Sequence, residues 1–145
     1  MINVRLAEVT DIGSIIPLIK NELGYSDLDE TYLISRLNEI LKREDFVTFV
    51  ASKDDKTAGF IGAQKGISYV TPGFDTVIMV LAVNKQYMRM GIGRALVKAV
   101  EDWSVKQGIK KISLSSNLVR TGAHAFYENC GYTKSSYKFK KNMEG

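Results

Sequence analysis

Seven consecutive apolar residues, 77–83, form the most hydrophobic run of the chain. The run does not alternate and is rich in β-branched residues, which predicts a central strand buried on both faces. A helical pattern follows from Gly91, and its apolar face contains Ile92, Ala95, Leu96, Ala99, Val100 and Trp103. This spacing predicts an amphipathic helix that ends near Gly108. The centre of the chain therefore reads as strand, turn and helix.

The flanking patterns extend this unit to a mixed α/β domain. Strands are predicted at 3–7, 46–51, 58–63 and 111–115, with a hairpin turn at 53–56 and possible extension of the third strand through 67–70. Two apolar helical faces lie between the first two strands, and Pro17 predicts a kink or a late start in the first of them. A last helix is expected around Ala123, Phe126 and Cys130. We expect one domain, residues 1–145, with helices on both faces of its sheet.

Composition narrows the function classes. The 145 residues are 45% hydrophobic and 25% charged, typical of a soluble globular protein. We expect a cytoplasmic protein, because no signal peptide or membrane span is recognisable and a single cysteine excludes an internal disulfide. The charge of +4 is scattered, so nucleic acid is not expected as a partner and no membrane association is predicted. One histidine and one cysteine do not make a zinc site, and no metal is expected.

Gly91 and Gly93 stand where the predicted strand turns into the predicted helix. They remove two side chains beside helix amides that lack an intrahelical partner, an arrangement suited to an anion. Leu96 replaces the third glycine of a dinucleotide fingerprint, and no Walker sequence occurs. The anion is therefore not predicted to be part of a nicotinamide cofactor or held by a Walker loop.

Two motifs resemble the Gcn5-related N-acetyltransferase (GNAT) superfamily. The first is its Gln/Arg-x-x-Gly-x-Gly/Ala segment, here Met88 to Gly93, in which Met88 replaces the usual Gln or Arg and Arg89 and Arg94 are alternative sources of positive charge. The second is Asn117 followed by the Ala-x-x-Phe-Tyr helix of residues 123–127. The order and spacing of both motifs fit the superfamily, and within it the cofactor half is most similar to aminoalkylphosphonate and aminoglycoside-type acetyltransferases.

The resemblance implies a GNAT-like fold: a mixed, mostly antiparallel sheet of six to seven strands, splayed at its centre. It also implies acetyl-CoA as the acetyl donor, with Tyr127 as the general acid for the CoA thiolate, although a role in packing the pantetheine is the alternative. The implied donor-binding residues are Leu81, Ala82, Val83, Met88, Arg89, Met90, Gly91, Ile92, Gly93, Arg94, Asn117, Phe126 and Tyr127. A backbone N–H near Leu81 to Val83 is the implied oxyanion donor.

The general base and the acceptor stay open. Met79 and Val80 occupy the strand positions where many family members have a carboxylate, which leaves Asp75, Glu22 or a water as the base. Glu22, Tyr25 and Asp75 are the candidate acceptor contacts, and their acidic and aromatic character suits a cationic small-molecule amine. Acetylation of a protein lysine or N-terminus and a CoA-binding module without turnover are the alternatives. A homodimer and a longer acyl donor also remain open.

Overall fold

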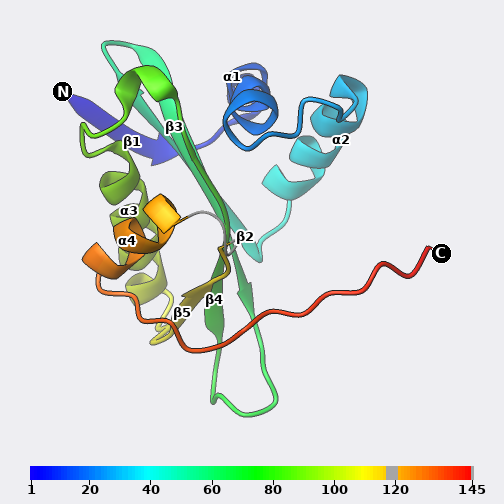
Figure 1. Cartoon of the computed structure of the whole chain (residues 1–145), viewed down its shortest axis with the longest axis vertical. Helices are drawn as coiled ribbons and strands as arrows, with labels where there is room; N and C mark the ends of the chain where they lie inside the picture. The colour runs from blue at the N-terminus through cyan, green and yellow to red at the C-terminus, as the bar shows by residue number, and fades with distance from the viewer. Residues whose placement is uncertain (117–120, 145) are drawn as a thin grey trace. The chain divides into compact units, whose positions relative to one another are not determined.

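The computed structural model describes residues 1–116 and 121–144 (Figure 1). It divides the chain into two compact units, Met1–Leu114 and Ser115–Gly145, which we describe separately. No helix in the described residues is long and apolar enough to cross a membrane.

The first unit is built on one twisted sheet. Its strands are β1 (Ile2–Leu6), β2 (Phe46–Lys53), β3 (Lys56–Gly66), β4 (Asp75–Val83) and β5 (Ile112–Leu114), in the spatial order β1-β2-β3-β4-β5. Neighbouring strands are antiparallel except β4 and β5, which are parallel. The mixed, mostly antiparallel sheet is as predicted. The described residues form five strands, fewer than the six to seven that the resemblance implies.

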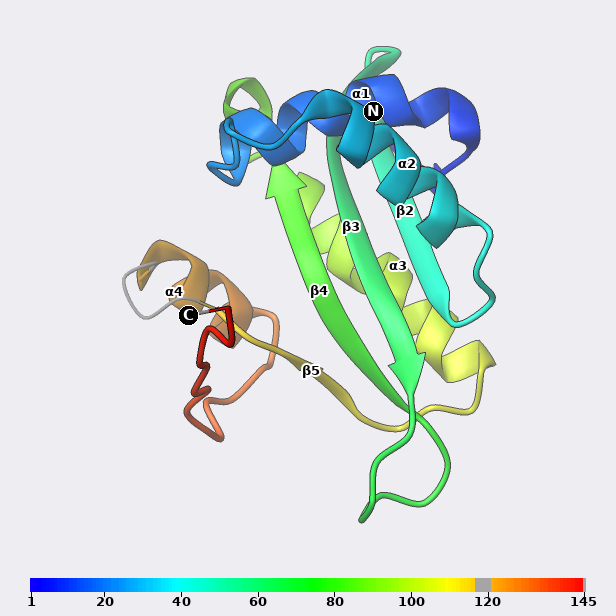
Figure 2. The same cartoon turned by 90° about the vertical axis from the view of Figure 1, so that its right-hand side faces the viewer.

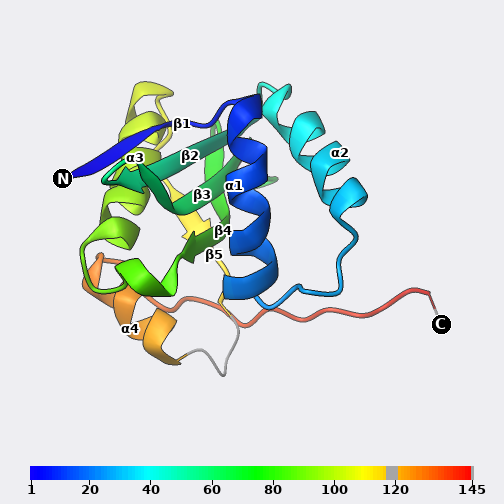
Figure 3. The same ribbon diagram turned by 90° about the horizontal axis from the view of Figure 1, so that it is seen from above.

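Helices cover both faces of this sheet, as the sequence predicts (Figures 2 and 3). On one face lie α1 (Ile12–Pro17), its continuation η2 (Leu18–Glu22) and α2 (Glu30–Leu41); on the other lies α3 (Ile92–Lys106). Val50, Phe60 and Ala82 are paired across β2, β3 and β4 and so project from one face, where they pack with the apolar residues of α1 and α2.

Pro17 changes the geometry of the first helix. The α-helix ends at Pro17 and the chain continues as one π-helical segment, Leu18–Glu22, in which the Leu23 amide donates to the Leu18 carbonyl. Proline has no amide hydrogen and its ring opposes the preceding turn, so the regular ladder cannot pass through it. The predicted irregularity is therefore confirmed, and it places Glu22 at the end of this segment.

The prediction that strand 77–83 is buried on both faces is wrong in its amino half. Val77 is 41% exposed and Met79 58% exposed, whereas Ile78 and Ala82 are buried. Figure 2 shows the reason: α1 and its continuation η2 cross the sheet near the carboxyl end of β4, and α2 lies over β2, so these helices leave the amino half of β4 uncovered on that face. We call this uncovered part, around Val77 and Asp75, the bare face.

The second unit contains α4 (Thr121–Asn129). The Cys130 amide donates to the carbonyls of Phe126 and Tyr127, and Gly131 follows with φ of 94°. This left-handed glycine ends the helix in the position where glycine is most favoured. The Tyr132 amide then returns to the Tyr127 carbonyl at 3.0 Å.

Candidate acetyl-CoA site

The turn from β4 to α3 forms an open cradle of backbone amides. Asn84 Oδ1 accepts a hydrogen bond from the Gln86 amide at 2.9 Å and so caps a short 3-10 turn, η3 (Lys85–Tyr87). Arg89 and Gly91 then both adopt positive φ, 64° and 87°. Two left-handed residues within three positions reverse the chain tightly, and glycine adopts such a conformation without steric cost. The turn thereby brings the chain directly into α3.

Gly91 is also the N-cap residue of α3. Its carbonyl accepts from the Ala95 amide at 3.0 Å, but it contributes no side-chain cap to the first turn of the helix. The early amides of a 15-residue helix are thus available to an external acceptor. The exposed side chains of Arg89 and Arg94 flank this turn. Open amides together with two guanidinium groups favour an anion such as a pyrophosphate.

The implied donor-binding residues near this turn divide into two kinds. Ile92 is 1% exposed, and its side chain packs beside Gly59 in β3, so only its backbone is available to a ligand. Met88 and Met90 are exposed, at 56% and 47%. The missing Gln or Arg at position 88 is consequently replaced by an apolar surface, and positive charge at the turn comes from its neighbours.

A free strand edge leads away from the cradle. β5 pairs with β4 over three residues only, Thr76–Ile78 against Ile112–Leu114. Among the described residues, Val80 to Val83 are paired with β3 on one side, and Met79 to Val83 are paired with no strand on the other. The predicted splay is therefore present. Such an edge offers N–H and C=O groups to an extended ligand that adds itself to the sheet. Ala82 directs its side chain into the helix-covered core, so it too would contact a ligand through its backbone.

A β-bulge lies at the middle of β4. The register passes from Gly62 opposite Val80 to Ala63 opposite Ile78, so Met79 has no partner residue in β3. Bulges bend the strand and redirect backbone groups, and they occur frequently beside active sites. The sequence analysis missed this bulge. Glycine within a strand pattern is its usual signal, and Gly62 stands at the shift.

The candidate acceptor residues do not form one cluster. Glu22 ends the segment η2, which contacts β4 and whose Leu18 belongs to the same buried core as Ala82, near the carboxyl end of the strand. Tyr25 follows shortly after and is exposed. Asp75, in contrast, is the first residue of β4. Ala82 lies seven positions after Asp75, which is about 23 Å at the rise of a β-strand. Glu22 and Tyr25 therefore belong to one end of β4, and Asp75 belongs to the other.

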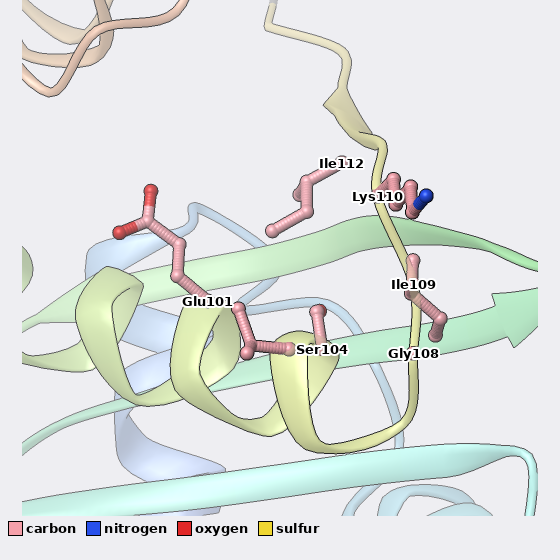
Figure 4. Close-up of a pocket in the computed structure, with 7 residues that line it drawn as sticks. Glu101, Ser104, Gly108, Ile109, Lys110 and Ile112 are labelled. Atoms are coloured by element: carbon pink, nitrogen blue, oxygen red, sulfur yellow. The ribbon is translucent and has the colours of Figure 1, made fainter.

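A pocket of about 450 Å³ lies elsewhere on the first unit (Figure 4). It is formed by the last turns of α3 and the connection to β5, with lining residues Glu101, Ser104, Val105, Gly108, Ile109, Lys110 and Ile112. It contains no predicted site residue and lies toward the opposite end of α3 from the cradle. The pocket is therefore separate from the proposed donor site.

The second unit holds Phe126 and Tyr127. Their rings meet edge to face with centroids 5.2 Å apart, and Tyr127 makes a similar contact with Tyr132 at 6.3 Å. Such contacts hold the half-buried Tyr127 ring in a fixed orientation within this unit. Asn117 lies outside the described residues. Among the residues that the structure describes, no group of histidine, cysteine and carboxylate side chains could hold a metal.

Comparison with known proteins identifies the class. Residues 14–132 match the "Acetyltransferase (GNAT) family". The chain is 33% identical over 118 residues to the uncharacterized N-acetyltransferase YhdJ of Bacillus subtilis, covering 80% of this chain and 82% of that protein. It is 26% identical over 106 residues to aminoglycoside N(6')-acetyltransferase type 1 of Stenotrophomonas maltophilia, covering 70% and 69%. It spans 47% of N-acetyltransferase 8 of Homo sapiens.

Structure comparison agrees with the sequence match. The CoA complex of aminoglycoside N-acetyltransferase AAC(6')-Iy superposes with a TM-score of 0.90 at 16% identity, over 100% of this chain and 96% of that one. The chain belongs to the GNAT family. It is an N-acetyltransferase that uses acetyl-CoA as the acetyl donor.

Proposed function

We propose that this enzyme acetylates a primary amine of a small molecule by direct attack on the thioester of acetyl-CoA. One observation supports the proposed binding of acetyl-CoA: the open edge of β4, Met79 to Val83, continues into the amide cradle at Gly91. This path suits an extended pantetheine arm that ends in a pyrophosphate. The backbone N–H groups of Leu81 to Val83 are the proposed donors to the thioester oxygen.

Tyr127 is proposed to complete the reaction. The amine nitrogen bonds to the acetyl carbon, the carbon–sulfur bond breaks, and the leaving thiolate takes the phenolic proton of Tyr127. The proton lost by the amine needs a separate acceptor. Asp75 lies six residues before Leu81, about 20 Å along the strand. That distance favours Glu22, near the carboxyl half of β4, or a water over Asp75 as the base.

A small acceptor is favoured by the short elements around this half of β4. Within the described part of the first unit, the elements that cover the adjacent face of the sheet are α1 with η2, the segment through Tyr25, and α2 (Figure 2). Glu22 and Tyr25 supply a carboxylate and an aromatic ring, which together suit an ammonium group. The aminoglycoside acetyltransferases among the similar proteins are named for small polyamino substrates, which supports the same class for this chain.

The test is a direct assay of acetyl transfer. Purified protein, acetyl-CoA and a thiol reagent are mixed with a panel of small amines, including diamines, polyamines and aminoglycosides, and with lysine-containing and free N-terminal peptides. We expect the best small amine to exceed every peptide in kcat/KM. A peptide with kcat/KM about tenfold above all the small amines would replace this proposal with protein acetylation. CoA binding with no turnover of any acceptor would favour a binding module.

A further inference from the structure

Asp75 occupies a distinctive position on the bare face. It is paired with Gly66 and precedes Thr76, whose side chain is hydrogen-bonded to Ser104 of α3. Because side chains alternate along a strand, Asp75 points away from α3. Its neighbour on the same face is Val77, which is exposed. The carboxylate therefore lies on the face that α1 and α2 leave uncovered.

One oxygen of this carboxylate lacks a partner. Asp75 Oδ1 is buried and accepts no hydrogen bond from the described residues, and no ion pair involves Asp75 within that part of the chain. A buried carboxylate oxygen without a donor is costly, and such groups are normally satisfied by a cation, a donor or water. The half-exposed residue is still reachable from solvent.

The nearest lysine in the hairpin is engaged elsewhere. Lys65 is paired with Thr76, so it projects toward the α3 face. Its ammonium donates to Gln107 Oε1 at 3.2 Å and lies 4.4 Å from the ring centroid of Phe74. The Phe74 ring thus lies against Lys65 and is not part of the surface around the carboxylate. The unpartnered Asp75 oxygen and the exposed apolar side chain of Val77 on the same face favour an organic cation that combines an ammonium with a methylene chain.

We infer that Asp75 binds a second ammonium group of an elongated polyamine, far from the amine that is acetylated. This inference rests on the proposed function, which puts the reacting amine near Leu81. Asp75 is about 20 Å from Leu81 along β4. The distance between the Asp75 carboxylate and the reacting amine is shorter than this, because the Asp75 side chain and the acetyl group each cover part of it. A short diamine cannot span it, whereas an extended tetra-amine can. Substrate length is thus selected by the uncovered half of β4.

The experiment compares spermine with 1,5-diaminopentane in the wild-type enzyme, Asp75→Asn and a charge-matched control, Asp55→Asn, at the exposed β2–β3 turn. For the wild-type enzyme, we expect the KM for spermine to be about tenfold lower than the KM for 1,5-diaminopentane. Asp75→Asn should raise the KM for spermine about tenfold with kcat nearly unchanged, since a charge-assisted contact is lost. The constants for 1,5-diaminopentane should not change in either variant. Asp55→Asn should match the wild type for both amines.

An unchanged spermine KM in Asp75→Asn overturns the inference, and so does an equal effect on both amines, which would put Asp75 beside the reacting centre. If neither amine is acetylated, the proposed acceptor class fails for these compounds, and calorimetry with spermine then tests Asp75 independently of turnover. Binding that weakens at least about fivefold in Asp75→Asn but not in Asp55→Asn supports the second-ammonium site. Equal binding by all three proteins rejects it.

Discussion

Thr76 in β4 and Ser104 in α3 are joined by a buried hydrogen bond of 2.8 Å between their hydroxyl groups. Ser104 Oγ also donates to the Val100 carbonyl at 2.8 Å. A hydroxyl has one proton, so Ser104 uses its own on Val100 and Thr76 is the donor to Ser104. This chain of hydrogen bonds ties the amino half of β4 to α3, the helix that begins at the proposed acetyl-CoA cradle.

Ser104→Ala should therefore destabilise the protein more than the loss of one average hydrogen bond. The substitution leaves the Thr76 hydroxyl buried with no acceptor, and such an orphaned group costs about 1–3 kcal/mol. Denaturant unfolding measures the loss. In the double variant Thr76→Val/Ser104→Ala no hydroxyl remains, so much of the stability should return. A double variant as unstable as the sum of the single variants would contradict the coupling of the two hydroxyl groups.

The pair Arg5 and Asp11 gives a pH-dependent prediction. Arg5 donates to both Asp11 oxygens at 2.8 Å, and the Glu8 amide donates to Oδ2 at 2.7 Å. The Arg5 hydrogen bonds, with help from the Glu8 amide, lower the pKa of Asp11 below its usual value. A lowered folded-state pKa stabilises the protein above the unfolded pKa of about 3.9, and this stabilisation is lost as the pH falls through the folded pKa.

Asp11→Asn should accordingly lower the free energy of unfolding by about 1–2 kcal/mol at pH 7 and reduce the acid sensitivity below pH 4. Urea unfolding at pH 7 and at lower pH measures both effects. Asp102→Asn is the control, because Asp102 pairs with Lys98 at 3.2 Å on the exposed surface of α3 and such pairs contribute little. A wild-type pH profile in Asp11→Asn would show that the Arg5 pair does not stabilise the fold.

Gly59 allows α3 to approach the sheet. A β-carbon at this position would lie 2.7 Å from the Ala82 carbonyl oxygen and 3.2 Å from Ile92 Cγ2. The first contact is with backbone, which cannot move aside without shifting β4. Gly59→Ala should cost about 1–3 kcal/mol by overpacking and should also weaken CoA binding, because Ile92 opens α3. Gly66→Ala, where nothing lies within 4 Å, is the matched control in thermal unfolding and calorimetry.

The predictable part of the fold was encoded in local patterns. The 3.6-residue period of α3 and the proline in the first helix led to the observed elements, since each depends on nearby residues. The exposure of Val77 and Met79 was not predictable in this way, because it depends on where α1 and α2 lie across the sheet. An apolar run alone does not reveal which of its residues a distant helix covers.

The candidate site shows the same division. The turn at Gly91 and the start of α3 follow from local turn chemistry and lie where the sequence predicted them, whereas the binding of an anion there stays a prediction. The separation of Asp75 from Glu22 depends on tertiary packing, since the two residues come from elements far apart in the chain. The bulge at Met79 is only partly predictable from the sequence. Gly62 signals it locally, but its register depends on the pairing between β3 and β4.

The cradle is tested by Gly93→Asp in the first turn of α3. We expect CoA binding to be lost, since a carboxylate at this position adds bulk and repels the pyrophosphate. Calorimetry with CoA measures the affinity, and circular dichroism checks that the variant is folded. Ser35→Asp at an exposed position of α2 adds the same charge elsewhere and should bind CoA normally. Unchanged affinity in folded Gly93→Asp would remove the amide cradle from the proposed donor site.

Tyr127→Phe tests the proposed general acid. The substitution keeps the ring that meets Phe126 and Tyr132 edge to face, so the packing within the second unit should persist. Without the hydroxyl, the thiolate leaves unprotonated, and kcat should fall by about 10²–10⁴ while CoA affinity changes little. Steady-state kinetics and calorimetry separate these effects, and Tyr132→Phe is the matched control. Wild-type turnover in Tyr127→Phe would assign Tyr127 to packing alone, whereas a parallel loss in Tyr132→Phe would indicate that the shared aromatic cluster, and not proton donation, limits the rate.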